Sequence, residues 1–386
     1  MKLLILNWGA YTQRDITETL IENHIICKTV NYCFADKNND SFFSSRFSQY
    51  VKETKYDAVF TVNYFPLIAE ICYQYHIKYL SWSYDNPLNV LRIEETLAYE
   101  TNYVFLFDRI QAEHFKKQGY KTVYHLPLAV NTKRLDKIIL TPKERSHFSS
   151  EISFVGKLYP STFQELVLPL SDHNKGYLDA IVKSQLQIYG YYFVDELLTP
   201  LFLEKINQEY ADRFLGTEFY ITKEQLSYSL SSYITREERL LLLGLLSRHH
   251  LLKLYSRENL SILDSAVYMG SAKYLSDMPK IFKASQINLN ITLKILQSGI
   301  PLRVMDILGA GGFLISNYQP ELMEYFLPET DFVMYDSIED AADKANFYLH
   351  HEDLRLSIAS NGHKKVAEQF NYTEQLKKLF EISGLY

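Results

Sequence analysis

Short apolar runs alternate with amphipathic stretches over the first 130 residues of the chain. Runs rich in β-branched and aromatic residues predict strands, which we place at 2–6, 25–30, 56–62, 78–82, 103–107 and 121–126. Apolar positions that recur every three or four residues predict helices at 15–23, 66–75 and 110–118. Such an alternation predicts a parallel sheet covered by helices on both faces.

The same alternation returns in the second half of the chain. Strands are predicted at 151–155, 251–255, 287–291, 313–316 and 332–335, and helices at 278–285, 302–308, 320–325, 338–349, 354–370 and 372–382. A further helix is predicted at 235–249, because Thr235 followed three residues later by Glu238 is typical of a capping box.

The segment from about 161 to 233 shows helical periodicity and few strand signals. It is too long for an ordinary crossover between two strands, so we interpret it as a helical insertion. The charged residues at 132–150 predict a linker. The fold class that follows is α/β, with two Rossmann-like doubly wound domains at 1–131 and 151–386, the second carrying the insertion.

Composition and charge narrow the function classes. Of the 386 residues 47% are hydrophobic and 22% charged, which favours a sizeable core over disorder. The formal net charge is −6 without long runs of one sign, which argues against nucleic acid as a partner. Three cysteines without metal-ligand spacing, and no apolar run of membrane-spanning length, predict a cytoplasmic protein; work beside a membrane surface stays compatible with the sequence.

Four of the 14 glycines lie at 299, 309, 311 and 312. The sequence Gly-Ala-Gly-Gly at 309–312 suggests a dinucleotide motif, but a phosphate-binding glycine loop follows a strand and opens a helix. Here the glycines follow a predicted helix. We therefore expect them to end it and to let it pack closely against the next strand, which disfavours a Rossmann oxidoreductase.

The start of that helix is a better candidate for chemistry. Gly299 and Ile300 precede Pro301, so free amides of a helix N-terminus are expected beside a flexible loop, where they suit an anion or a sugar hydroxyl. Arg303 and Asp306, three residues apart, share a helix face. The plain alternative is a solvated ion pair, but the apolar surroundings predict partial burial. Such a pair suits a phosphate and a sugar diol.

Polar residues also follow the strands of the first half, where open parallel sheets bind ligands. Each position also has a structural alternative: a tight turn for Gly9, an N-cap for the segments that contain Asp85 and Arg109, and a hydrogen-bonded structural histidine for His125. The candidates are Gly9, Asp85, Asn86, Arg109 and His125.

The run GIPLRVMDILGAGGFLISNYQPELMEYF at 299–326 resembles the C-terminal signature of bacterial GT-B glycosyltransferases, in particular the spore maturation (CgeB-like) family. Nearly the whole chain shares the resemblance. Further matching segments are YDAVFTVNYFP (56–66), YLSWSYDNP (79–87), FLFDR (105–109), HLPLAVN (125–131), ISFVGKLYP (152–160), INLNIT (287–292) and NGHKKVAEQFNYTEQL (361–376).

The resemblance implies transfer of a sugar from a nucleotide-diphosphate donor to a protein or cell-surface glycan. The C-terminal domain would bind the donor, with Lys157 and Arg303 at the phosphates and Asp306 at the ribose. The donor-side residues so implied are Gly156, Lys157, Tyr159, Asn290, Gly299, Ile300, Pro301, Leu302, Arg303 and Asp306. Many related retaining enzymes carry two glutamates eight apart in this element, whereas this chain has Ser298 and Asp306.

Related folds work without a bound metal, and we expect neither a metal nor another cofactor here. Lys157, Arg303 and the turn at 299–302 would then stabilise the leaving diphosphate. The resemblance favours retention; inversion would need a base, for which Asp85 and His125 are candidates on the acceptor side with Gly9, Asn86 and Arg109. A non-catalytic glycan- or partner-binding protein is the alternative function, and a homodimer is compatible with the sequence.

Overall fold

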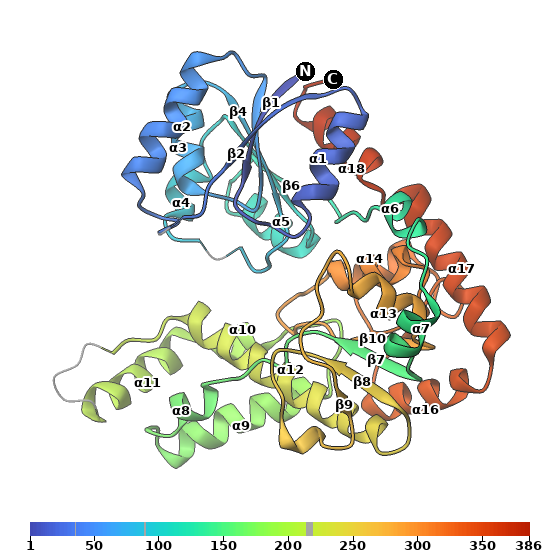
Figure 1. Ribbon diagram of the computed structural model, residues 1–386. Coiled ribbons are helices and arrows are strands. Elements are labelled where there is room, and N and C mark those ends of the chain that lie inside the picture. The colour runs from blue at the N-terminus through green and yellow to red at the C-terminus, as the bar shows by residue number, and fades with distance from the viewer. Residues whose placement is uncertain (35, 89, 214–218) are drawn as a thin grey trace. The chain divides into compact units, whose positions relative to one another are not determined.

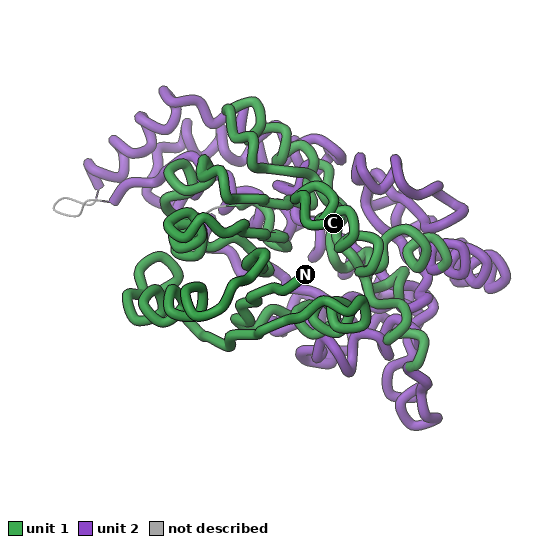
Figure 2. Tube along the Cα trace, turned by 90° about the horizontal axis from the view of Figure 1, so that it is seen from above, with its two compact units in different colours: residues 1–137, 298–309, 364–386 green, residues 138–297, 310–363 purple. Residues whose placement is uncertain are grey.

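The computed structural model describes residues 1–34, 36–88, 90–213 and 219–386, which form two compact units. Unit 1 comprises residues 1–137, 298–309 and 364–386, and unit 2 comprises residues 138–297 and 310–363 (Figure 2). The expected domains were 1–131 and 151–386. The compact units differ from them because 298–309 and 364–386 pack with the N-terminal sheet.

Unit 1 is built on a six-stranded parallel sheet of order β2-β1-β3-β4-β5-β6 (Figure 1). Every strand predicted in the first half is present. The bounds are β1 (Lys2–Asn7), β2 (Ile26–Asn31), β3 (Ala58–Val62), β4 (Lys78–Ser83), β5 (Asn102–Leu106) and β6 (Val123–His125).

Helices cover both faces of this sheet (Figure 1). The main core joins strand residues such as Leu4 and Val104 to Phe43, Phe47 and Ile68 of the helices. The helices of unit 1 are α1 (Gln13–Glu22), α2 (Ser41–Glu53), α3 (Pro66–Gln74), α4 (Ile93–Thr96), α5 (Arg109–Lys117), α6 (Thr132–Asp136), α14 (Leu302–Gly309) and α18 (Tyr372–Ile382), and α17 (Glu352–Gln369) has residues in both units.

Unit 2 has a second six-stranded parallel sheet, of order β12-β11-β10-β7-β8-β9. Its strands are β7 (Ile152–Val155), β8 (Leu252–Tyr255), β9 (Val267–Tyr268), β10 (Ile287–Asn290), β11 (Leu314–Asn317) and β12 (Val333–Tyr335). Only β9 was not predicted, because it is two residues long and exposed at the sheet edge. Helices α7 (Pro142–Phe148), α13 (Met278–Ala284), α15 (Pro320–Tyr325) and α16 (Ile338–Leu349) and a short 3₁₀ turn η1 (Ser261–Leu263) accompany this sheet.

The insertion is helical, as its periodicity predicted, although residues 214–218 of it lie outside the described residues. It has a hydrophobic core of its own, which includes Leu178, Tyr210 and Leu230. Its helices are α8 (Phe163–Val167), α9 (Asp172–Leu186), α10 (Val194–Leu197), α11 (Pro200–Arg213) and the first half of α12 (Lys223–Ser247).

The predicted helix start at Thr235 is wrong. Helix α12 begins twelve residues earlier, where Thr222 and Gln225 form the capping box. Thr235 is buried inside the helix, and its hydroxyl donates to the carbonyl oxygen of Ser231 at 2.7 Å. The spacing misleads because residues three apart share a face in any part of a helix.

The predicted linker at 132–150 contains two short helices. Asn131 caps α6, and Thr141 with Glu144 forms a capping box on α7. Arg134 of α6 binds the buried Asp15 carboxylate through Nε at 2.7 Å and Nη2 at 2.8 Å. The charged residues that suggested a linker therefore cap and anchor helices.

Candidate functional site

The donor-side residues predicted from the sequence fall in both units. Gly156, Lys157, Tyr159 and Asn290 belong to unit 2. Gly299, Ile300, Pro301, Leu302, Arg303 and Asp306 belong to unit 1.

A buried arginine joins two strand-end loops in unit 2. Arg239 of α12 donates through Nη1 to the carbonyl oxygen of Lys157, after β7, and through Nη2 to that of Ile291, after β10. Its guanidinium lies 4.8 Å from the ring centroid of Tyr159 and 5.2 Å from that of Phe154. Because a guanidinium stays charged even when buried, Arg239 brings a fixed positive charge to the carboxyl ends of these strands.

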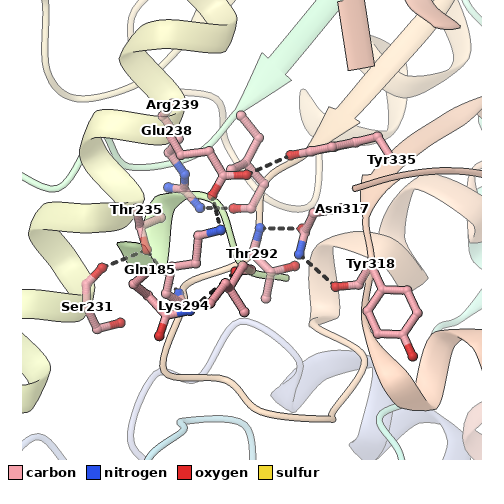
Figure 3. A network of polar contacts seen from close by, with 12 residues as sticks. Gln185, Ser231, Thr235, Glu238, Arg239, Thr292, Lys294, Asn317, Tyr318 and Tyr335 are labelled. Carbon is pink, nitrogen blue, oxygen red and sulfur yellow. Dashed lines mark hydrogen bonds and ion pairs between the residues drawn. The ribbon is translucent and has the colours of Figure 1, made fainter. Parts of the chain in front are cut away.

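The loop after β10 is also held by α12, as Figure 3 shows. The backbone N–H of Lys294 donates to the Thr235 hydroxyl at 3.0 Å, and that of Ile295 donates to the Ser231 hydroxyl at 2.8 Å. Both acceptors lie on α12, of which the first half belongs to the insertion. Ser231, within the insertion, and Thr235, just after it, therefore hold this loop in place.

A second buried cation lies in the same network (Figure 3). The Lys294 ammonium is 2.9 Å from Oε2 of Glu238, with exposed side-chain fractions of 6% and 1%. Oε1 of Glu238 accepts from the Tyr335 hydroxyl at 3.2 Å, and Lys294 lies 3.8 Å from the ring centroid of Tyr189. Burial, and then the charge of Glu238, raise the pKa of both tyrosines, so they stay protonated donors.

Together, Arg239, Lys294 and Glu238 carry two positive charges and one negative charge. All three are buried near the carboxyl ends of β7 and β10. Buried cations at the carboxyl ends of parallel strands suit an anion such as a diphosphate. Sequence reasoning missed Arg239 and Lys294, because a charged residue on a helix or loop is usually solvated.

The Asn290 side chain forms hydrogen bonds within the sheet of unit 2. Its side-chain amide donates to the Thr292 hydroxyl at 2.9 Å and to the Ser316 hydroxyl at 3.0 Å. The next link is the Thr292 N–H, which donates to Oδ1 of Asn317 at 2.8 Å (Figure 3). These bonds join the ends of β10 and β11, which gives the predicted donor-side residue Asn290 a structural role.

The turn before α14 is fixed in place, whereas a flexible loop was expected. The Asp108 carboxylate accepts from the N–H of Ser298 at 3.0 Å and from that of Gly299 at 3.3 Å. A Cβ on Gly299 would lie 2.8 Å from the carbonyl oxygen of Phe107. The Gly299 amide, predicted to be free for a donor, is therefore bonded to a carboxylate in this structure.

Helix α14 carries the predicted pair Arg303 and Asp306. Nη1 of Arg303 lies 3.3 Å from Oδ2 of Asp306, and the side chains are 23% and 11% exposed. The prediction of a partly buried pair, made from the three-residue spacing and the apolar surroundings, is confirmed, while the roles of the pair toward a donor stay predictions. At the other end, a Cβ on Gly309 would lie 2.5 Å from Val130, so glycine allows α14 to pack against residues 130 and 135 rather than against the next strand.

The candidates of the first half lie at the carboxyl ends of unit 1's strands. Gly9 has a φ of 94°, which favours glycine, and His125 ends β6, half-buried. Arg109 opens α5 on the surface, 4.0 Å from Glu113. Asn86 donates to the Gln111 side chain at 3.2 Å.

Asp85 does not cap a helix, although its place before a proline suggested this alternative. The next helix, α4, begins only at Ile93. Instead, Oδ2 of Asp85 accepts from the side-chain amide of Asn63 at 2.6 Å. Asn63 follows β3 as Asp85 follows β4, so neighbouring parallel strands bring the two side chains together. The sequence offered no signal for Asn63.

Two cavities differ in what they can hold. The cavity beside Lys294 and Gln319 in unit 2 has a volume of only about 10 Å³, too small for a sugar. The cavity at the strand ends of unit 1 has a volume of about 240 Å³. Of the predicted candidates only Asp85 lines this cavity. The other lining residues are Lys37, Asn38, Asn63, Tyr64, Phe65, Pro66, Pro87, Leu88, Val90 and Leu91.

Among the described residues, no group of three or more His, Cys, Asp or Glu side chains is placed to hold a metal ion. The expectation of a protein that needs no metal stays a prediction. The helices of the described chain are too short or too polar to cross a membrane.

Residues 239–381 match a family model described as glycosyl transferase-like. This match covers less than half of the chain. It begins at Arg239 and includes Lys294, Arg303 and Asp306. No curated protein matches the sequence.

Solved structures show where the fold occurs. The chain is similar to HepE of Anabaena in complex with UDP-glucose, with 10% identity, 100% of both chains covered and a TM-score of 0.55. It is also similar to the sucrose-phosphate synthase of Thermosynechococcus elongatus, with 11% identity over 100% of this chain and 99% of that chain and a TM-score of 0.57. A glycosyltransferase from Rickettsia africae follows, with 11% identity, 99% and 97% coverage and a TM-score of 0.53. These similarities and the two parallel sheets confirm the predicted GT-B type of α/β fold with two Rossmann-like parts.

Proposed function

We propose that the chain is a glycosyltransferase that takes a sugar from a nucleotide-diphosphate donor. The observation that carries the proposal is the buried group of Arg239, Lys294 and Glu238 near the carboxyl ends of β7 and β10. In a transfer without a metal, fixed cations must stabilise the charge that develops on the leaving diphosphate. The glycosyl transferase-like match over 239–381 supports the same activity.

UDP is the first nucleotide to test, because HepE, with the same fold, was solved with UDP-glucose. We keep the predicted donor roles for each unit separately: in unit 2 Lys157, exposed after β7, would neutralise phosphate, and in unit 1 Arg303 would neutralise phosphate while Asp306 accepts from ribose hydroxyls. Asp85 belongs to the acceptor side. The proposal has further parts. The transfer retains the configuration of the sugar and needs no metal, and the acceptor is a protein or a cell-surface glycan. The protein is cytoplasmic and related to the CgeB-like proteins.

The test is binding of UDP to the full chain by calorimetry, followed by hydrolysis of UDP-sugars and transfer to candidate acceptors. We expect Arg303→Ala and Asp306→Ala to lower the affinity for UDP at least about tenfold, since each removes a charge-assisted hydrogen bond. The matched control is Arg14→Ala, from the exposed pair of Arg14 with Glu18.

Unchanged UDP affinity in both variants, with a folded protein, would refute the assignment of these residues. Binding of UDP-sugars without hydrolysis or transfer to any acceptor would favour the non-catalytic, glycan-binding alternative. No binding of any nucleotide sugar would refute the proposed function.

A further inference from the structure

We propose that the 240 Å³ cavity of unit 1 binds one neutral sugar ring, the terminal unit of the acceptor. The role of this sugar as the acceptor rests on the proposed function, but the binding of a sugar ring in the cavity does not depend on it. The cavity lies at the carboxyl ends of β3 and β4, where an open parallel sheet presents its ligand-binding loops.

The acidic part of the cavity is rigidly built. Asn63 adopts the left-handed conformation, with a φ of 65°. Its side chain accepts from the backbone N–H groups of Tyr84 at 2.8 Å and Asp85 at 3.3 Å, and it donates to Oδ2 of Asp85 at 2.6 Å. Asparagine adopts this conformation more readily than most residues, and here its side chain ties the loops after β3 and β4 together.

Asp85 is exposed, and these bonds engage only one of its two carboxylate oxygens. Among the described residues, Oδ1 of Asp85 has no hydrogen-bond donor, while Oδ2 is bonded to Asn63. A carboxylate oxygen is a strong acceptor for a hydroxyl group. Asp85 therefore suits a ligand that donates a hydrogen bond, such as a sugar hydroxyl.

A donor on an exposed lysine, Lys37, lines the same cavity. The Lys37 ammonium lies 4.7 Å from the ring centroid of Trp8 and 5.9 Å from that of Phe65. The Trp8 ring is itself anchored, because Nε1 donates to the carbonyl oxygen of Val62 at 2.7 Å. In the part of the chain that the structure describes, no carboxylate lies within ion-pair distance of Lys37, so its N–H groups can serve a ligand.

The charges and the apolar lining select the class of ligand. One cation and one carboxylate give the lining no net charge, and together they offer both a donor and an acceptor, as hydroxyl groups require. The apolar lining residues Pro87, Leu88, Val90 and Leu91 suit the C–H face of a sugar ring. The volume of about 240 Å³ is below the roughly 300 Å³ at which pockets for drug-sized ligands begin, which favours a single ring.

The test is saturation-transfer NMR on the full chain with the methyl glycosides of glucose, galactose, mannose and N-acetylglucosamine. Glucuronate and glucosamine are the charged competitors. We expect at least one neutral glycoside to bind, and its affinity to fall about tenfold in Asp85→Asn and in Lys37→Gln, the usual effect of losing a hydrogen bond to a charged group. Asp85→Asn keeps an oxygen for Asn63, so the loop is expected to stay intact.

Two matched controls test the site itself. Asp57→Asn changes an aspartate that accepts from the Lys2 N–H outside the cavity, and Lys52→Gln changes a lysine that lies 5.3 Å from the Tyr75 ring centroid outside the cavity. Both variants are expected to bind the glycoside like the unchanged protein. Failure of all four neutral glycosides, preference for a charged sugar, or equal losses in the controls would overturn the inference.

UDP binding, measured on the same samples, separates this inference from the proposed function. Binding of UDP without any glycoside would overturn the cavity assignment alone. Binding of a glycoside without any nucleotide sugar would support the cavity assignment and refute the proposed function.

Discussion

Asp108 binds Ser298 through both of its carboxylate oxygens: Oδ2 accepts from the Ser298 N–H at 3.0 Å, and Oδ1 accepts from its hydroxyl at 3.1 Å. The Ser298 hydroxyl in turn accepts from the N–H of Ile110 at 3.2 Å. The resemblance of the sequence to GT-B glycosyltransferases would lead us to expect a glutamate at the position of Ser298. In this chain a carboxylate still lies beside that position, but it comes from the N-cap of α5 and binds backbone and serine groups.

The first prediction concerns Asp108, which caps α5 by accepting from Gln111 at 2.9 Å and also holds the turn at 298–299. Asp108→Asn is expected to lower the free energy of unfolding by about 2–3 kcal/mol, because buried N–H groups lose a charged acceptor. Urea denaturation measures the loss, and hydrogen exchange should show faster exchange at residues 298 and 299.

The control for this prediction is Asp40→Asn. Asp40 caps α2 by accepting from Phe43 at 2.8 Å. Because asparagine caps a helix about as well as aspartate, Asp40→Asn is expected to cost much less than Asp108→Asn. Equal destabilisation by the two variants, with unchanged exchange at 298 and 299, would contradict a positioning role for Asp108.

The second prediction concerns Gly299. In Gly299→Ala the new Cβ would lie 2.8 Å from the Phe107 carbonyl oxygen and 3.0 Å from the Asp108 Cα. Backbone atoms cannot move aside as a flexible side chain can, so we expect a loss of about 1–3 kcal/mol in the free energy of unfolding and weaker UDP binding. Gly176→Ala is the control, because Gly176 lies inside α9 with open space around it, and it should stabilise by about 0.5–1 kcal/mol.

The third prediction concerns the buried pair of Glu238 and Lys294. Glu238→Gln leaves the Lys294 ammonium without its carboxylate in a buried place, which is expected to cost about 3–5 kcal/mol of unfolding free energy. Glu18→Gln, in the exposed pair with Arg14, should cost less than about 1 kcal/mol. A small loss in Glu238→Gln would mean that Lys294 is solvated in solution.

The sequence predicted the strands of both units because buried strands are nearly continuous apolar runs. All five residues of β3, AVFTV, are buried, and such a run between turns is readily recognised. The long helix α12 was predicted only in part, since Thr235 with Glu238 imitates a capping box at a place where α12 is continuous.

The candidate site was less predictable, because its contacts join residues far apart in the sequence. Nothing near Asp108 indicates that it meets Ser298, 190 residues away, and nothing near Asn63 indicates that it meets Asp85. The burial of Glu238 and Lys294 depends on how the insertion packs. Periodicity reports which face of an element is apolar, but it does not report which loops meet at a sheet edge.

The last prediction concerns the stability of the protein at low pH. Lys280, whose ammonium binds Glu144 at 2.5 Å, and the backbone and hydroxyl of Thr141 lower the pKa of Glu144 from an ordinary 4.5 to about 2. A carboxylate with a lowered folded-state pKa stabilises the protein above its unfolded pKa, and this contribution is lost as the pH falls from about 4.5 towards 2. Glu144→Gln should therefore make the urea midpoint fall less steeply between pH 5 and pH 3 than it does in the unchanged protein, as measured by urea denaturation at each pH. Glu165→Gln, an exposed glutamate in the first turn of α8, should leave the pH dependence nearly unchanged; the same slope in all three proteins would show that the bond between Glu144 and Lys280 does not persist in solution.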